Sequence, residues 1–163
     1  LYVEAKGGRL HVQPAVGDVW LTTFESSPER PDDPATALPG EMTLREAILK
    51  KVLEDLALVE SIEGNLVTSR DGLPIENQVP ADLPAETLGF VLSQSLTDSE
   101  ITMEKLHLGS VRQLLVRTDS RLFSLIPLDA ETVLITILRH DASRDTWQAR
   151  LQGAAMMLAS VFQ

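Results

Sequence analysis

The sequence predicts a three-layer α/β sandwich: a five-stranded antiparallel sheet with helices on both faces, preceded by an N-terminal β extension. Three observations predict this fold. After residue 42, helical and strand periodicities follow one another in the order α-β-β-α-β-β-β-α. The turns between consecutive strands are short, which favours antiparallel pairing. The strand expected over 131–139 is apolar on both faces and therefore needs a layer of helices on each side.

The composition is that of a protein with a packed core and an acidic surface. Hydrophobic residues make up 44% of the 163 residues, which suits one domain with some additional chain. The formal net charge of −10 disfavours nucleic acids and anionic membranes as partners, because both would be repelled. This charge indicates either a solvated acidic shell, which we favour, or attraction to a basic partner. The absence of Cys excludes disulfides, thiolate metal sites and Cys nucleophiles.

No apolar run in the sequence approaches the roughly 20 residues that span a bilayer, and no signal peptide is visible. We therefore expect a cytoplasmic protein without a membrane span. The chain begins with Leu1 rather than Met, which leaves open whether it is part of a longer protein.

Residues 1–24 are predicted to form a β-hairpin extension. Short alternating segments flank a double glycine at 7–8, which is typical of a hairpin, and residues 19–24 have the composition of a further strand. Residues 25–42 carry four prolines and are predicted to be a linker, because proline removes an amide donor and blocks helix. The main domain is then expected over 43–163. Whether the extension covers the sheet, reaches a partner subunit or ends an upstream domain stays open.

The first helix is expected over residues 44–60 and starts at a capping box. Thr43 and Glu46 have the spacing that lets each side chain bond the backbone amide of the other. Apolar residues then recur at helical intervals, which predicts that one side of this helix is buried.

The next two strands are expected over 64–70 and 73–78, with the Asp-Gly pair at 71–72 between them. The Ser-Arg-Asp cluster at 69–71 could be a polar active site on a turn, or only the corner of a hairpin. Asp-Gly suits positive φ at both central positions of a two-residue turn, and no nearby His completes a base. We therefore favour the hairpin corner.

The second helix is expected over 84–106, with Asp82 as its N-cap and Gly109 ending it. Small residues along this helix would let another helix approach closely: Gly89, Ser93 and Ser95. Either two copies of the chain meet symmetrically at this helix, or it packs within its own chain and leaves a solvated back. The residues alone do not separate these alternatives.

Three strands and a helix complete the domain. The strands are expected over 111–118, 121–128 and 131–139, and the tight Asp119-Ser120 turn predicts that the first two form a hairpin. The last helix is expected to start near Ser143, with an apolar stripe along one side.

Over roughly residues 43–162, these elements resemble the Roadblock / dynein light chain family. The similarity lies in the helix that leads into residues 62–73, the long second helix, residues 108–116, and the closing strand and helix. The resemblance implies small non-enzymatic proteins that form homodimers or heterodimers, with second helices packed together and third strands paired. It also implies platforms for Ras-like small GTPases, motor complexes or other scaffolds. In one bacterial branch, such proteins accelerate GTP hydrolysis by ordering residues that the GTPase already owns.

On this resemblance we expect a bacterial homodimer that regulates or scaffolds a Ras-like small GTPase, with stimulation of GTP hydrolysis as the stronger form of the hypothesis. The expected dimer interface comes from the second helix and the third strand: Leu88, Gly89, Leu92, Ser95, Ser99, Val111, Gln113 and Leu115. The alternative is a small-molecule-sensing regulatory domain with a pocket between sheet and helix. An enzyme is the third hypothesis, and it lacks any recognisable nucleophile motif.

No catalytic, cofactor-binding or metal-binding residue is expected. His11, His107 and His140 fall in different predicted elements, whereas a metal site needs three or four converging ligands. The sequence has no glycine-rich phosphate loop, so the chain is not expected to bind GTP itself.

Three arginines flank the hairpin of the third and fourth strands: Arg112, Arg117 and Arg121. One of them could complete a GTPase site as an arginine finger. We favour the simpler function of charged protection for an edge strand.

Overall fold

The computed structural model describes residues 2–5, 8–15, 19–26 and 43–163. They fall in two compact units, Leu1–Ile48 and Leu49–Gln163, and each unit is described by itself.

The first unit contains a three-stranded antiparallel sheet in the order β1-β2-β3. Its strands are β1 (Tyr2–Ala5), β2 (Gly8–Ala15) and β3 (Val19–Ser26). Ala5 lies opposite Gly8, as a hairpin at the double glycine requires, although the turn itself lies outside the described residues. Strand β3 extends two residues into the segment expected as a linker, and 27–42 also lie outside the described residues. The linker and the domain boundaries therefore stay predictions.

The second unit is built on a five-stranded antiparallel sheet in the order β5-β4-β8-β7-β6. Its strands are β4 (Ile62–Ser69), β5 (Pro74–Gln78), β6 (Leu114–Arg117), β7 (Arg121–Pro127) and β8 (Thr132–Arg139). Strands β4 and β8 pair through the middle of the sheet, with Leu66 opposite Ile135.

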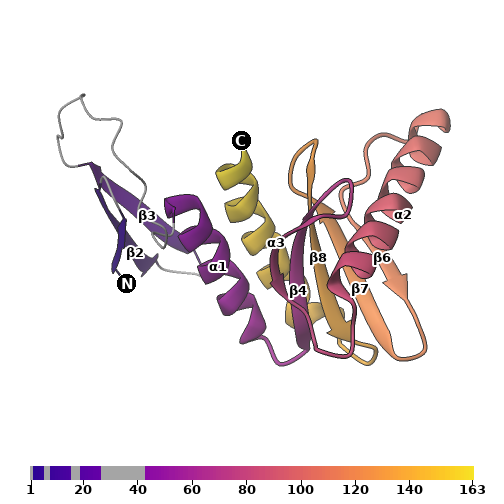
Figure 1. Cartoon of the computed structure of the whole chain (residues 1–163), viewed down its shortest axis with the longest axis horizontal. Helices are drawn as coiled ribbons and strands as arrows, with labels where there is room; N and C mark the ends of the chain where they lie inside the picture. The colour runs from indigo at the N-terminus through magenta and orange to yellow at the C-terminus, as the bar shows by residue number, and fades with distance from the viewer. Residues whose placement is uncertain (1, 6–7, 16–18, 27–42) are drawn as a thin grey trace. The chain divides into compact units, whose positions relative to one another are not determined.

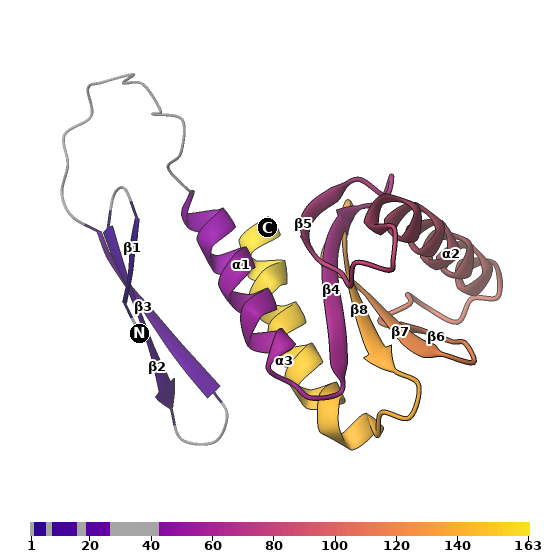
Figure 2. The same cartoon turned by 60° about the horizontal axis from the view of Figure 1, so that its bottom comes forward.

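Helices cover both faces of this sheet (Figures 1 and 2). Helix α2 (Ala85–Lys105) lies on one face, and helix α3 (Arg144–Phe162) lies on the other together with residues 49–57 of α1 (Leu44–Ala57). The predicted three-layer sandwich and its order of elements are thus confirmed.

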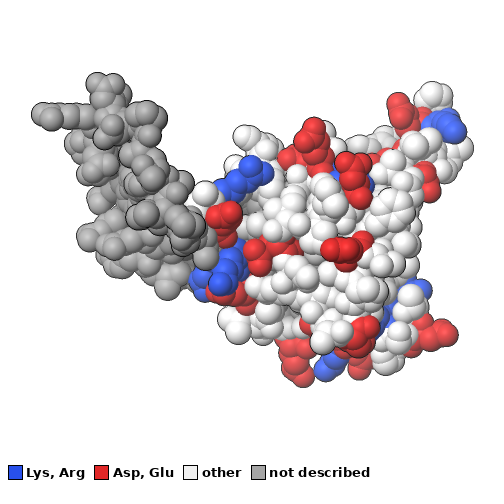
Figure 3. All heavy atoms as spheres, viewed as in Figure 1, with Lys and Arg blue, Asp and Glu red and all other residues white. Residues whose placement is uncertain are grey.

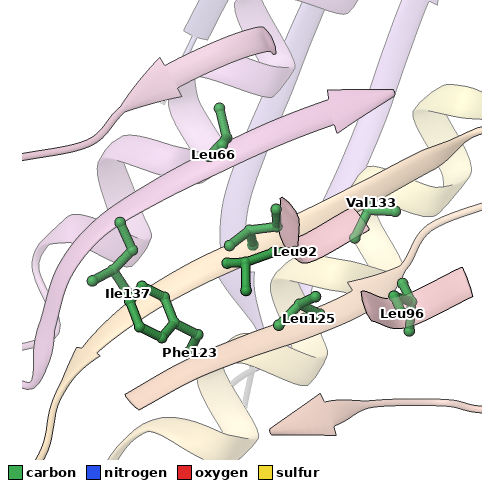
Figure 4. Packing of buried hydrophobic residues seen from close by; sticks show 8 residues of the cluster. Leu66, Leu92, Leu96, Phe123, Leu125, Val133 and Ile137 are labelled. Carbon is green, nitrogen blue, oxygen red and sulfur yellow. The ribbon is translucent and has the colours of Figure 1, made fainter. Parts of the chain in front are cut away.

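The layer between α2 and the sheet is apolar. Leu92 and Leu96 of the helix are buried in a cluster of side chains from three strands (Figure 4): Leu66, Phe123, Leu125, Val133, Ile135 and Ile137. Burying each such side chain contributes about 1.5–3 kcal/mol to folding. Strand β8 is buried on both faces from Thr132 to Leu138, which explains its apolar character on both sides in the sequence.

The two predicted helix caps have different outcomes. The capping box is confirmed: the Thr43 amide donates to Glu46 Oε2 at 2.8 Å, and the Glu46 amide donates to Thr43 Oγ1 at 3.2 Å. The bond from the Thr43 amide lowers the pKa of Glu46. The Asp82 N-cap was wrong, because α2 begins after Pro84 without a side-chain cap. Asp82 instead pairs with Arg121 at 2.9 Å.

Two elements are at least three residues shorter than the sequence predicted. Helix α1 ends at Ala57, where the amides of Leu58 and Val59 bond carbonyls three residues back and tighten the last turn. Strand β6 starts at Leu114 rather than at Val111. The side chain of Gln113, just before β6, is bonded to a residue of β7, as described below.

Candidate functional site

The side of α2 that faces the sheet packs within its own chain. Gly89, Leu92, Ser93 and Leu96 are its buried residues. A Cβ at Gly89 would lie 2.8 Å from the carbonyl oxygen of Gly72, so glycine is required there for close contact between α2 and the β4–β5 turn. Two of the expected dimer residues, Gly89 and Leu92, are therefore accounted for by packing within the protomer.

The Ser-Arg-Asp cluster forms this β4–β5 turn and anchors α2. The Gly72 amide donates to the carbonyl of Ser69 at 2.9 Å, and Gly72 has a φ of 84°. The Ser69 amide donates to the Leu73 carbonyl at 2.9 Å, so residues 70–72 form the corner. It contains one left-handed residue, whereas the sequence predicted a two-residue turn with positive φ at both positions. Arg70 reaches from this turn to the carboxylate of Glu100 in α2, and Ser93 Oγ donates to the Ser69 carbonyl at 3.4 Å.

The opposite, solvent side of α2 has two flanks. Helical spacing places one set of residues together on the first flank: Leu88, Val91, Ser95, Ser99, Thr102 and Leu106. This flank lies opposite the one that meets the β4–β5 turn, and β6 is the sheet edge opposite β5, so we call it the β6-side flank. Phe90 lies on the other flank, where the helix backbone touches Gly72.

The hydroxyl groups of the β6-side flank are bonded to their own helix. Ser95 Oγ donates to the Val91 carbonyl at 2.9 Å, Ser99 Oγ to the Ser95 carbonyl at 2.8 Å, and Thr102 Oγ1 to the Asp98 carbonyl at 2.8 Å. A hydroxyl that already donates a hydrogen bond within its own helix costs less free energy to bury than one without a partner. The flank is therefore more compatible with a dry contact than its residue types suggest.

Large apolar side chains are exposed along and beyond α2. Val91 is 52% exposed, Leu106 is 58% exposed and Leu108 is 69% exposed. On the face drawn in Figure 3, uncharged atoms cover most of the central area and acidic side chains are scattered among them. Within the described residues, nothing covers these apolar groups, and the hydroxyl-bearing residues Ser95, Ser99 and Thr102 lie between Val91 and Leu106 along the flank.

Strand β6 is an edge of the sheet, and the remaining expected dimer residues lie in it or just before it. Leu115 is 39% exposed, while Val111 is partly buried against the α2 core. Gln113 turns inward: its Nε2 donates to Ser124 Oγ at 2.8 Å and its Oε1 accepts from Gln148 of α3 at 3.0 Å. Among the described strands, β6 pairs only with β7, so one row of its backbone groups is open to another strand.

Comparison with known proteins assigns this arrangement to a family. Residues 48–138 match the model of the Roadblock/LC7 domain. The chain belongs to the Roadblock/LC7 family.

Solved Roadblock structures share the fold at low sequence identity. The MglB protein solved in a tetrameric arrangement superposes with a TM-score of 0.67 at 15% identity, covering 80% of this chain and 96% of that one. The gliding protein MglB of Thermus thermophilus gives a TM-score of 0.65 at 13% identity, with 80% and 97% covered. A Roadblock/LC7 domain from Streptomyces avermitilis gives 0.59 at 20% identity, with 69% and 92% covered.

Curated relatives come from an archaeon. The uncharacterized proteins MJ0310 and MJ1340 of Methanocaldococcus jannaschii are each 30% identical to this chain over 69 residues, which is 42% of the chain. The match covers 60% of the length of each relative.

The arginines of this Roadblock domain differ in their partners. Arg121 binds Glu63 at 2.7 Å and Asp82 at 2.9 Å, and its hydrogen bond lowers the pKa of Asp82. Arg117 donates to the carbonyl of His140 at 3.1 Å. Arg112, just before the open edge of β6, is exposed.

One feature of the site, at the C-terminal end of α2, was not predicted from the sequence. His107 has a φ of 54°, its amide donates to the Glu104 carbonyl at 2.9 Å, and the Leu108 amide donates to the Met103 carbonyl at 3.0 Å. These two bonds define a helix stop that usually contains glycine at the position of His107. Gly109 also has a positive φ, of 87°, but it lies two residues beyond the stop.

Within the described part of the chain, no three His, Asp or Glu residues are grouped closely enough to hold a metal ion. The side chain of His11 lies outside that part. None of the described helices is both long enough and apolar enough to cross a bilayer.

Proposed function

We propose that this chain is a Roadblock-domain regulator that forms a homodimer through the β6-side flank of α2 and the open edge of β6. The paired protomers then present a composite surface to a Ras-like small GTPase. The protein acts by shape and by ordering its partner, and it supplies no bond-making group of its own.

One observation carries the proposal: an exposed helix flank whose hydroxyls are bonded internally lies on the same side of the domain as an unpaired strand edge. A two-fold axis places equal elements opposite each other, so the helix meets its copy and the edge strand meets its copy. Pairing of the edges would satisfy backbone groups of Leu114–Arg117, and helix contact would cover Val91 and Leu106.

Membership of the Roadblock family supports the GTPase partner. Family members serve as platforms for Ras-like GTPases, as the resemblance in the sequence implied. The fold shared with the MglB structures is consistent with that class of partner.

Self-association is tested by light scattering of the full chain together with a pair of matched variants. Ser95→Arg places a charge and a long side chain on the β6-side flank and is expected to convert the dimer to a monomer. Gln94→Arg introduces the same side chain at the neighbouring exposed position away from this flank and is expected to stay dimeric. A wild-type monomer at micromolar concentration, or equal behaviour of the two variants, contradicts the proposed interface.

GTPase binding is tested separately by titrating the wild-type chain into Ras-like GTPases of the source organism, loaded with GDP or with a non-hydrolysable GTP analogue. We expect a complex that prefers one nucleotide state and is lost in the Ser95→Arg variant. Single-turnover hydrolysis then measures stimulation of GTP cleavage. A dimer that binds none of these GTPases in either state contradicts the GTPase part of the proposal and leaves the dimer intact.

A further inference from the structure

A row of polar side chains crosses the sheet on the face opposite α2. Asn65 of β4 lies opposite Thr136 of β8, and Thr136 lies opposite Ser124 of β7. All three are fully buried. Their strand neighbours, such as Leu66, belong to the cluster under α2, so alternation points this row toward the layer of α3 and α1.

Helix α3 is bonded to one end of the row. Gln148 donates to Gln113, and Gln113 donates to Ser124. On the other side, Thr146 Oγ1 lies 3.5 Å from Ser61 Oγ, next to the start of β4. Trp147, between these two contacts, is 1% exposed and lies on the buried side of α3.

Several polar atoms of this layer have no hydrogen-bond partner among the described protein atoms. They are Nδ2 and Oδ1 of Asn65, Oγ1 of Thr136 and Nε1 of Trp147. Native proteins pair nearly all of their buried polar atoms, with protein or with ordered water. Four such atoms on three residues of three packed elements therefore point to a bound species rather than to independent defects.

We propose that this layer contains a structural water site, in which ordered water bridges Asn65, Thr136 and Trp147. The donors and acceptors match water: the Asn65 amide and the Trp147 indole N–H donate, while Asn65 Oδ1 and the Thr136 hydroxyl accept. Buried water molecules usually make about three hydrogen bonds to protein. Globular proteins hold about one buried water for every 27 residues, so a unit of this size is expected to hold about four.

Substitution of Thr136 by Val tests the site, because the two side chains have the same shape. If water bridges the hydroxyl, Thr136→Val removes one ligand of that water and lowers the urea midpoint of unfolding. If the layer is dry, the same change removes an unpartnered hydroxyl and raises the midpoint. Thr68→Val is the matched control, since Thr68 is fully buried on the other face and donates to the Leu73 carbonyl at 3.0 Å. Thr68→Val is expected to lower the midpoint by the loss of an ordinary hydrogen bond.

A direct Asn65–Thr136 hydrogen bond, formed after a rotation of the Asn65 amide, would also make Thr136→Val destabilising. Magnetisation transfer from water in NMR distinguishes this case. The water site predicts transfer from a long-lived water to the side-chain amide protons of Asn65 and to the indole proton of Trp147. A raised midpoint in Thr136→Val, or the absence of such transfer at both residues, overturns the proposal.

Discussion

The guanidinium of Arg70 in the β4–β5 turn binds both carboxylate oxygens of Glu100 in the C-terminal half of α2, at 2.5 and 3.1 Å. The two side chains are 21% and 30% exposed, so the pair is partly shielded from solvent. It ties a turn at the end of the sheet to the helix that carries the proposed dimer surface. Arg70, which in the sequence could have belonged to a polar active site, thus holds the helix of the proposed dimer surface in position.

Arg70→Met should lower the free energy of unfolding by about 1–2 kcal/mol, because it removes a bidentate charged hydrogen bond and leaves Glu100 without its partner. Lys51→Met is the control, since Lys51 pairs with Asp55 at 2.7 Å while both side chains are more exposed, at 42% and 51%. An exposed pair of this spacing contributes only about 0.3–0.5 kcal/mol. Equal losses in urea denaturation of the two variants would show that Arg70 does not anchor α2.

Gly89→Ala should destabilise the protein by about 2 kcal/mol, because the added methyl would lie 2.8 Å from the Gly72 carbonyl oxygen and push α2 off the turn. Gly153→Ala in α3 is the matched change. No atom lies within 4 Å of a Cβ at Gly153, so it should gain about 0.5–1 kcal/mol from helix propensity. Thermal unfolding of both variants checks the difference in sign, and a neutral Gly89→Ala would argue against this close contact.

His107→Gly should stabilise the protein by about 1 kcal/mol, since it removes the cost of a left-handed conformation in a residue with a Cβ. Gly109→Ala should do the reverse by about 1 kcal/mol. Its added methyl meets no atom within 4 Å, so only backbone strain acts. Chemical denaturation measures both effects. If His107→Gly proves destabilising, the histidine side chain contributes a contact that outweighs the strain.

The ion pair of Asp82 with Arg121 should make stability depend on acid. Arg121 lowers the pKa of Asp82 below its ordinary 3.8 in the folded chain. The contribution is therefore fully present above about pH 4 and is lost as the pH falls through the lowered folded value. In Arg121→Met, NMR titration should give an Asp82 pKa close to 3.8. Arg139→Met, which breaks pairs with Glu60 and Asp141, should leave the Asp82 pKa unchanged. An Asp82 pKa that stays low in Arg121→Met would assign the shift to another group.

The elements themselves could be predicted from the sequence because their signals are local. The capping box at Thr43 and the two-sided apolar pattern of β8 depend on residues close together in the chain, and both are present in the structure. The predicted N-cap at Asp82 was wrong because a capping preference is local and does not show long-range partners. The carboxylate of Asp82 pairs with Arg121, which is 39 residues away in the chain.

The candidate site was predicted less completely. Small residues on the second helix suggested close approach of another helix, yet Gly89 serves contact with the chain's own turn. Ser95 and Ser99, in contrast, lie on the outer flank and remain part of the proposed interface. A helical stripe shows which residues share a side and does not show which side faces the sheet.

By itself, the sequence determined the order of helices and strands, the three-layer class and the absence of cysteine chemistry, because periodicity and composition act over short stretches of chain. Only the tertiary structure decided that Arg70 anchors α2, that Gly89 faces inward, and that Asn65, Thr136 and Trp147 belong to one buried polar layer. Those relationships join residues 11 to 82 positions apart, and their energies depend on which atoms meet after the sheet and helices have packed.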